Sequence, residues 1–338
     1  MFKSLVLSFG IVVTLLACKE NKKQPRVVVE SPYSKEEIRF IPERHPVRMW
    51  ANDTSIFFSD IPQNTISVYS HKGVLQKRLG KSGPAPWENG TVWHFALDEA
   101  PDHYWVQDYP KQLIKKIDAT TGKLVASMKI ITIDNVQYIG NGRVVVPNMD
   151  EKTGALRLSV YDINRQSLIK HIDVSKMAGI SKPSVSDRLD FVLNGNMCAN
   201  STDAVHFCYN SGALFKINKQ TLAVSAIKEV RAYDLPKAVV EYGGVRLKPN
   251  LVMVSSAAMD SSHLYTLTSL NGNFAKTDKF FIDVYNLASN AYHHSFSMPI
   301  LNDEQRPVYI AVVKQKLIVY FENGTVVIYQ KPNLQDSL

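Results

Sequence analysis

Short apolar runs separated by polar turns make up the body of the chain. The runs are of strand length and rich in Val, Ile, Tyr and Phe, and Gly, Asn, Asp or Pro bounds most of them. We find no convincing long segment in which apolar residues keep the three-to-four-residue spacing of an amphipathic helix. The pattern therefore predicts an all-β protein.

One of these strands recurs six times. Each copy is an apolar run that ends in an aromatic residue or Ile and is followed by a polar residue. The copies end at Tyr69, Ile117, Tyr161, Ile217, Tyr285 and Tyr329. Their mean spacing is about 52 residues, close to the period of kelch-type blades. Neighbouring strands complete four per unit, so we predict a six-bladed β-propeller. The competing fold is a sandwich of similar strands, which would not need a regular period.

The two ends of the repeat complement each other. The chain stops soon after Tyr329, so the sixth blade lacks its outermost strand, whereas a spare strand at 37–42 precedes the first blade. Pairing this strand with the last blade would close the ring and cover an exposed sheet edge. The predicted propeller spans residues 37–332, and a tail follows at 333–338.

A Gly-Lys-Ser triplet at 80–82 has the ending of a nucleotide-binding P-loop. The first glycine of that motif would fall at Leu75, and two prolines and an Asn-Gly pair follow where a helix would have to begin. The segment is therefore interpreted as an interblade connection rather than as a phosphate site.

The first residues have the pattern of an export signal. Lys3 precedes a run from Leu5 to Leu16 that is almost wholly apolar and too short to span a bilayer as a permanent helix. The run ends in Leu-Leu-Ala-Cys, which resembles the bacterial lipobox. We predict a signal peptide at 1–17 and a lipid on Cys18, which would hold the protein on a membrane. The alternative is an ordinary signal peptide with a chance cysteine.

Residues 18–36 are polar and rich in lysine, so we expect a flexible tether. Lys19 follows the cysteine where Asp would favour inner-membrane retention in other bacteria. That pattern implies an outer-membrane lipoprotein that faces the periplasm or the cell surface.

The formal net charge is +8, and it falls by one when Lys3 is removed. Because the lysines are spread along the chain, we interpret them as a solvated surface, with attraction to anionic glycans or lipid headgroups as the alternative. A nucleic acid partner is not expected outside the cytoplasm.

Cys198 and Cys208 are the two cysteines of the body. An oxidising compartment permits a disulfide between them, and two unbridged buried thiols are the alternative. Two cysteines do not resemble a four-ligand zinc site, so no metal and no cofactor are expected.

A resemblance supports the fold. Leu79-Gly80, Gly83-Pro84 and Glu88 are followed by the strand Tyr104–Asp108 and a hairpin at Ile114–Gly122. These positions resemble the first two blades of the six-bladed, TolB-like propeller lipoproteins of Bacteroidota, although Ala-Pro-Trp interrupts their Gly-Pro-Gly-Glu-like motif here. The rest of the chain matches only in architecture and length. The resemblance implies a propeller fold and an envelope location, and it implies no activity.

The sequence carries no Gly-x-Ser-x-Gly elbow and no His-Glu-x-x-His motif. His293 and His294 are adjacent on a predicted outer strand, so we expect them on opposite faces, one exposed and one half-buried, and not on one metal. Two carboxylates in a propeller channel could act as a glycosidase acid and base, but the sequence does not show which acids converge.

Two interblade connections are longer than the others, at 175–189 and 229–250, and they should cross on the same face as 81–90. Long loops gathered on one face suggest a binding surface. Aromatic residues beside charges suit sugar rings or peptides, and packing within the loops is the alternative role. The candidates are Trp87, Glu88, Arg188, Arg231, Tyr233 and Tyr242. Trp50, Trp93 and Trp105 are expected in the core.

Three functions remain open from the sequence. The leading hypothesis is a non-catalytic, lipid-anchored propeller that binds a ligand or an envelope protein partner. The rival is a glycan hydrolase or lyase with its site at the channel mouth. The third possibility is structural support of a larger membrane assembly. Every sequence feature that fits the first hypothesis fits this one as well.

Overall fold

The computed structural model describes residues 26–28, 35–40, 46, 48–60, 63–97, 102–130, 136–229, 235–269, 279–298, 300 and 305–331. The predicted signal peptide, Cys18 and the predicted tail lie outside these residues. Within the described part, no helix has the length and apolar character that crossing a membrane requires.

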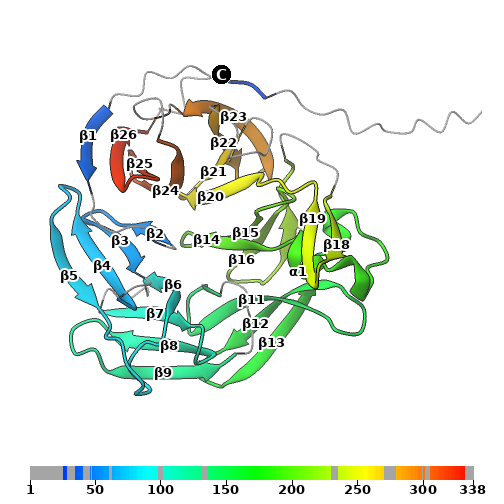
Figure 1. Cartoon of the computed structure of the whole chain (residues 1–338), viewed down its shortest axis with the longest axis horizontal. Helices are drawn as coiled ribbons and strands as arrows, with labels where there is room; N and C mark the ends of the chain where they lie inside the picture. The colour runs from blue at the N-terminus through cyan, green and yellow to red at the C-terminus, as the bar shows by residue number, and fades with distance from the viewer. Residues whose placement is uncertain are drawn as a thin grey trace, which may run out of the picture.

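Six four-stranded antiparallel sheets form a ring around a central axis, as Figure 1 shows. Blade 1 consists of β2 (Met49–Ala51), β3 (Ser55–Asp60), β4 (Thr65–Ser70) and β5 (Leu75–Leu79). Blade 2 consists of β6 (Val92–Leu97), β7 (His103–Asp108), β8 (Leu113–Asp118) and β9 (Leu124–Lys129). Blade 3 consists of β10 (Gln137–Tyr138), β11 (Arg143–Met149), β12 (Leu156–Asp162) and β13 (Ser167–Asp173).

The second half of the ring repeats this plan. Blade 4 consists of β14 (Gly195–Ala199), β15 (Asp203–Cys208), β16 (Leu214–Asn218) and β17 (Val224–Ala226). Blade 5 consists of β20 (Val254–Met259), β21 (His263–Ser269), β22 (Phe280–Asn286) and β23 (Ala291–Met298). Blade 6 consists of β24 (Pro307–Val313), β25 (Lys316–Phe321), β26 (Thr325–Gln330) and β1 (Lys35–Phe40). The predicted six-bladed propeller is confirmed, and the recurring strand is the third of every blade.

A strand at the start of the chain, β1, begins two residues before the strand predicted at 37–42. β1 runs antiparallel to β26, with Ile38 opposite Val327 and Phe40 opposite Thr325. That this strand is what holds the ring closed stays a prediction.

Because each blade has four antiparallel strands, every outermost strand ends on the face of the ring where the next innermost strand begins. All interblade connections therefore cross on one face, which we call the crossing face. The innermost strands β2, β6, β10, β14, β20 and β24 each start there and run into the ring.

Apolar side chains fill the spaces between neighbouring blades. Phe58 of blade 1 packs on Tyr320 of blade 6, with ring centroids 5.2 Å apart, and both are buried. Val106 of blade 2 and Phe57 of blade 1 belong to the next such cluster. The apolar side chains of each strand thus lie between neighbouring blades. Their burial there holds the blades together in the ring.

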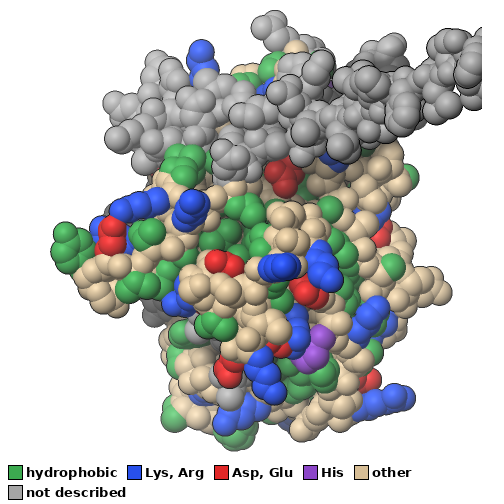
Figure 2. Space-filling model, turned by 90° about the vertical axis from the view of Figure 1, so that its right-hand side faces the viewer, with side chains coloured by type: hydrophobic (Ala, Val, Ile, Leu, Met, Phe, Trp, Pro, Cys, Tyr) green, Lys and Arg blue, Asp and Glu red, His purple; other side chains and the backbone are tan. Residues whose placement is uncertain are grey.

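The two long connections form small structures of their own. Between blades 3 and 4 lie η1 (Lys176–Ala178), η2 (Val185–Asp187) and α1 (Leu189–Val192), and between blades 4 and 5 lies the hairpin β18 (Lys237–Glu241)–β19 (Gly244–Lys248). Leu189 and Val192 are buried in a cluster against which Ala238 and Leu247 pack. Figure 1 shows the hairpin beside α1 at the rim of the ring. Figure 2 views this side, where basic and acidic side chains are interspersed rather than gathered.

Candidate functional site

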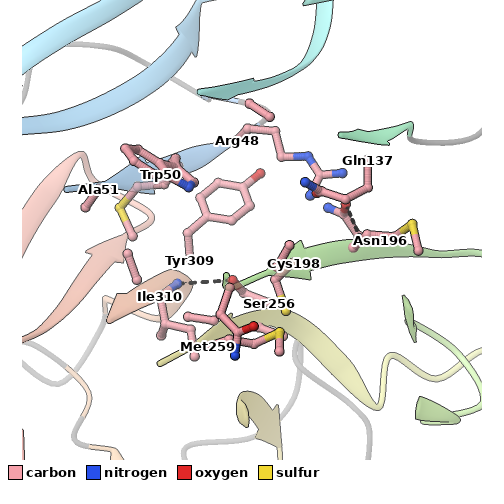
Figure 3. Close-up of a pocket in the computed structure, with 18 of the residues that line it drawn as sticks. Arg48, Trp50, Ala51, Gln137, Asn196, Cys198, Ser256, Met259, Tyr309 and Ile310 are labelled. Atoms are coloured by element: carbon pink, nitrogen blue, oxygen red, sulfur yellow. Dashed lines mark hydrogen bonds between the residues drawn. The ribbon is translucent and has the colours of Figure 1, made fainter. Parts of the chain in front are cut away.

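A cavity of about 410 Å³ lies at the centre of the ring. All six innermost strands line it, so each blade contributes side chains to one space. Figure 3 draws Arg48, Gln137 and Asn196 pointing into the same part of this cavity from three different blades. We call this space the central channel and consider it the candidate functional site.

Arg48 is the cation on the crossing-face side of the channel. It directly precedes β2, and its guanidinium lies inside the ring. Burial lowers the pKa of Arg48 from its ordinary value, although Tyr209, Tyr309 and Cys198 oppose this shift. An arginine keeps its proton even so. Among the described residues, Arg48 Nη2 is buried without a hydrogen-bond partner.

His94, near the start of β6, is only 6% exposed. Burial lowers its pKa well below the usual range, and the positive charge of Arg48 adds to the effect. The Gln137 side chain raises the pKa of His94 and so offsets part of this lowering. It does not form a hydrogen bond of good geometry with either ring nitrogen. His94 is therefore a neutral imidazole at pH 7 with both nitrogens unpartnered within the described part of the chain.

Neutral polar groups complete the wall. Tyr309 donates its hydroxyl proton to the carbonyl oxygen of Pro46 over 2.9 Å, and burial raises its pKa to about 12. Ser256 Oγ accepts a hydrogen bond from the amide of Ile310 over 3.1 Å. Asn196 Oδ1 accepts one from the amide of Met197 over 2.6 Å. These bonds hold the side chains in place around the cavity.

The charge of the channel has one sign. Arg48 and Lys219 are the charged residues among its described lining, which contains no Asp or Glu. The ammonium of Lys219 donates to the carbonyl oxygen of Asn200 over 2.8 Å, at the other end of β14 from the crossing face. A pair of carboxyl groups, as a glycosidase of the usual kind needs, is not found among these lining residues.

The two cysteines of the body are thiols and are not joined. Cys198 pairs with Val205 across β14 and β15, whereas Cys208 pairs with Gly195. Val205 and Cys208 are three residues apart, so the two thiols lie on opposite faces of the blade. Cys198 lines the channel, and burial raises the pKa of its thiol.

The Gly-Lys-Ser segment is a rigid interblade loop. Lys111 Nζ donates to the carbonyl oxygens of Gly83, Ala85 and Glu88 at 2.7–2.9 Å. Lys115, fully buried, donates to the Glu88 carbonyl over 2.7 Å and forms an ion pair with Asp108 over 2.7 Å. The side chains of Lys111 and Lys115 therefore donate to backbone carbonyl oxygens of this loop, whereas a P-loop would bind phosphate.

Two of the predicted binding residues belong to this loop. Trp87 is 55% exposed. The Glu88 carboxylate accepts a hydrogen bond from the Ala85 amide and pairs with Lys81, and these contacts lower its pKa. A Cβ on Gly83 would overlap that carboxylate, which explains the glycine and the glutamate of the motif. Glu88 is thus a loop-organising residue, and Trp87 remains accessible.

The other predicted residues lie at different connections. Arg188 pairs with Asp190 over 2.7 Å and stacks on Phe191, so it is engaged at the start of α1. Tyr242 is 96% exposed at the tip of the β18–β19 hairpin. Arg231 and Tyr233 lie outside the described residues. The structure therefore spreads the set over several connections of the crossing face and leaves Trp87 and Tyr242 as its exposed members.

The expectation for the histidine pair is wrong. His294 pairs with Val284 and Tyr292 with Tyr285, so His293 is an extra residue in a β-bulge. The bulge breaks the alternation of faces, and the two rings contact each other through their Nδ1 atoms. His293 is half-buried and His294 is buried. No group of three or more ligands that could hold a metal occurs among the described residues.

The tryptophans divide between the core and the channel. Trp105 is buried and stacks on Tyr138, as expected. Trp50 is half-buried, and it lines the channel while its ring meets Phe57 edge to face. The side chain of Trp93 lies outside the described set.

Part of the predicted tether is attached to blade 5. Arg26 forms a two-point ion pair with Asp283, at 2.7 and 2.8 Å, and its guanidinium lies 4.3 Å from the centre of the Phe281 ring. The Val27 carbonyl accepts the Ser295 amide proton over 2.9 Å. Both charged side chains are at most 5% exposed. The sequence prediction of a flexible tether is therefore wrong at 26–28, because Arg26 has a buried acidic partner.

Comparisons with known proteins show the fold. No protein-family model and no curated protein matches the chain. A solved protein of Bacteroides fragilis described as exported is 9% identical, with a TM-score of 0.54, over 92% of this chain and 98% of that one. The β-propeller domain of Cps50 (Swd1) from Myceliophteria thermophila is also 9% identical, with a TM-score of 0.48, over 89% of this chain and all of that one.

Sequence reasoning did not find the channel residues. Arg48, His94 and Gln137 lie close to the first residue of an innermost strand, where the chain enters the ring. A polar or charged residue at that position of a predicted innermost strand is the signal that could have identified them. At identities this low, the comparisons support the fold alone, so the assignment of the site depends on its geometry.

Proposed function

We propose that this protein is a non-catalytic, lipid-anchored propeller of the cell envelope that binds a small ligand in its central channel. The observation that carries the proposal is the cavity of about 410 Å³, which all six blades line and in which buried polar groups lack partners. Its volume lies within the range of about 300–1,000 Å³ that is typical of small-molecule sites. The exported protein of Bacteroides fragilis with the same fold is consistent with an envelope location.

The chemistry of the described lining favours binding over catalysis. Burial raises the pKa of the Cys198 thiol, so it is protonated and a poor nucleophile at pH 7. The neutral His94 has no nucleophile or acid hydrogen-bonded to it within the described residues. These groups suit the orientation of a ligand, whereas a hydrolase needs a nucleophile or two carboxyl groups.

The anchor would place blade 5 close to the membrane. Only seven residues separate Cys18 from Arg26, which is paired with Asp283. A fully extended chain of this length spans about 28 Å at most. A lipid on Cys18 would therefore hold the propeller within a short distance of the bilayer.

A thermal-shift screen of the mature protein, purified in detergent from its native membrane, tests the channel as the site. Small molecules, glycans and short peptides are compared on the wild type and on Ala257→Phe, which fills the channel. We expect ligands that raise Tm in the wild type and lose this effect in Ala257→Phe. Val125→Phe, on the exposed outer strand β9, is the control that should keep the effect.

A second candidate function is the docking of an envelope protein on the crossing face. Trp87, on its rigid loop, and Tyr242, on the hairpin, are exposed aromatic residues of the kind that anchor protein interfaces. Mass spectrometry of what copurifies with the tagged protein tests it. A stoichiometric partner that is lost in Trp87→Ala or Tyr242→Ala, but kept in Ala257→Phe, favours docking over the channel.

A further inference from the structure

We propose that the ligand of the central channel is a small organic anion, whose carboxylate or phosphate group binds Arg48 and whose body lies against the apolar wall. This inference rests on the proposed function and gives its ligand a chemical class.

Arg48 is half-buried, its Nη2 is fully buried, and no carboxylate interacts with it in the described structure. The groups that oppose the lowering of its pKa are Tyr209, Tyr309 and Cys198, and none of them is a carboxylate. No Asp or Glu occurs among the described residues that line the channel. A buried charge without a counter-ion is unfavourable, so an anion bound at Arg48 would be stabilised by the guanidinium.

The unpartnered donors line the same cavity. Arg48 Nη2 and both ring nitrogens of His94 are buried without partners among the described residues, and the Arg48 charge affects the pKa of His94. The planar guanidinium presents parallel N–H groups that match the two oxygens of a carboxylate or a phosphate. A neutral imidazole can donate one further N–H bond to the same group.

Part of the remaining wall is apolar. Trp50, Met259 and Ile310 line the channel, as do several alanines of the innermost strands. This apolar part, beside Asn and Ser side chains of the same lining, would bury an aliphatic or aromatic body of the ligand. The anion is therefore expected to be amphipathic, with the charged group at Arg48 and the apolar part further along the channel.

Titration calorimetry with matched probes tests this inference on the mature, detergent-solubilised protein. The probes are benzoate, phenylacetate and octanoate, their neutral amides, and phenyl phosphate. We expect the anions to bind and the amides to bind at least tenfold more weakly. The comparison of phenyl phosphate with the carboxylates shows which of the two anionic groups the site prefers. Equal binding of acid and amide overturns the anion inference and leaves the channel as a ligand site.

Three variants assign the effect to the channel. Arg48→Gln removes the charge and should weaken binding of the anions at least tenfold. Arg48→Lys keeps the charge but lacks the parallel N–H groups of the guanidinium, so it should weaken anion binding less than Arg48→Gln does. His94→Phe removes a ring that has no partner to lose, so it should fold and still weaken binding. Arg246→Gln, on the exposed hairpin, is the control and should bind as the wild type does.

The variants also separate the two proposals. Arg48→Gln should raise the Tm of the ligand-free protein, because it removes an uncompensated buried charge. If no anion binds the wild type, or if Arg48→Gln binds the anions unchanged, the anion inference is wrong. The proposed function then depends on the thermal-shift screen, in which neutral compounds still have to act through the channel.

Discussion

At the scale of single residues, buried charges and buried histidines determine which substitutions and which pH values destabilise this protein. Lys115 is fully buried, and its ion pair with Asp108 lies beneath the loop that follows β5. Asp108 also accepts the amide protons of Gly90 and Thr91. The burial and the partners of these charges could not be predicted from the sequence, because they depend on the packing of β8 against the loop.

Lys115→Met should destabilise the protein strongly. It leaves the buried Asp108 carboxylate with only the more distant Lys111, at 3.9 Å, as a cation. Removal of one partner of a buried ion pair typically costs about 3–5 kcal/mol. Urea unfolding followed by tryptophan fluorescence measures the loss, with the exposed Lys123→Met as the control. A loss similar to that of the control would show that the pair contributes little.

Acid should destabilise the protein through His206. Burial lowers the pKa of His206 to about 4, against about 6.5 for an unfolded chain. The unfolded state therefore takes up a proton first, so stability is full above pH 6.5 and falls as the pH drops towards 4. The difference between the folded and unfolded pKa values corresponds to a loss of stability of about 3 kcal/mol at most.

The free energies of unfolding of the wild type and His206→Gln, measured between pH 7 and pH 4, test this sign. The variant should be less stable at pH 7, and the difference should shrink by up to about 3 kcal/mol at pH 4. A constant difference between the wild type and His206→Gln would contradict the assignment.

At the scale of elements, the pairing of distant strands decides how the ring ends. β1 lies beside β26, although nearly the whole chain separates them. The segment at 26–28 contacts blade 5 through the Arg26–Asp283 pair. The sequence predicts the existence of the first strand, but only the fold shows that part of the tether also attaches to a blade.

Deletion of residues 35–40 tests whether β1 closes the ring. The deletion would expose the backbone edge of β26, so we expect a lower Tm and concentration-dependent association. Thermal unfolding and size-exclusion chromatography measure the two effects. Deletion of the polar residues 19–24 is the control, and an unchanged Tm after loss of 35–40 would show that the ring closes without this strand.

At the scale of the whole molecule, the ring turns six similar sheets into one cavity and one crossing face. The lysine-rich surface has its charges interspersed on the side seen in Figure 2, which fits solvation rather than a single basic patch. The predicted lipid on Cys18 would then be the main link of this molecule to a membrane.

The Cys18→Ala variant tests that link. Without the cysteine no lipid can be attached, so we expect the protein to move from the membrane fraction to the soluble envelope fraction. Radiolabelled palmitate should enter the wild type and not the variant. The Cys198→Ala variant, which removes a half-buried thiol from the channel, should keep both the label and the membrane location.

The strands, their sixfold period and the candidate export signal can be predicted from the sequence alone. These features depend on the alternation and spacing of side chains along the chain, which are local properties. The loop at 80–90 could also be separated from a P-loop by its prolines and its missing glycine.

Which polar residues lie together depends on the folded ring and could not be predicted from the sequence. Arg48, His94, Gln137, Asn196 and Tyr309 come from five different blades, and closure of the ring brings them to one cavity. The bulge at His293 and the buried partner of Arg26 likewise depend on contacts between distant segments. Burial lowers the pKa values of Arg48 and His94 and raises that of Tyr309. Burial is a property of the assembled ring, which no single strand possesses.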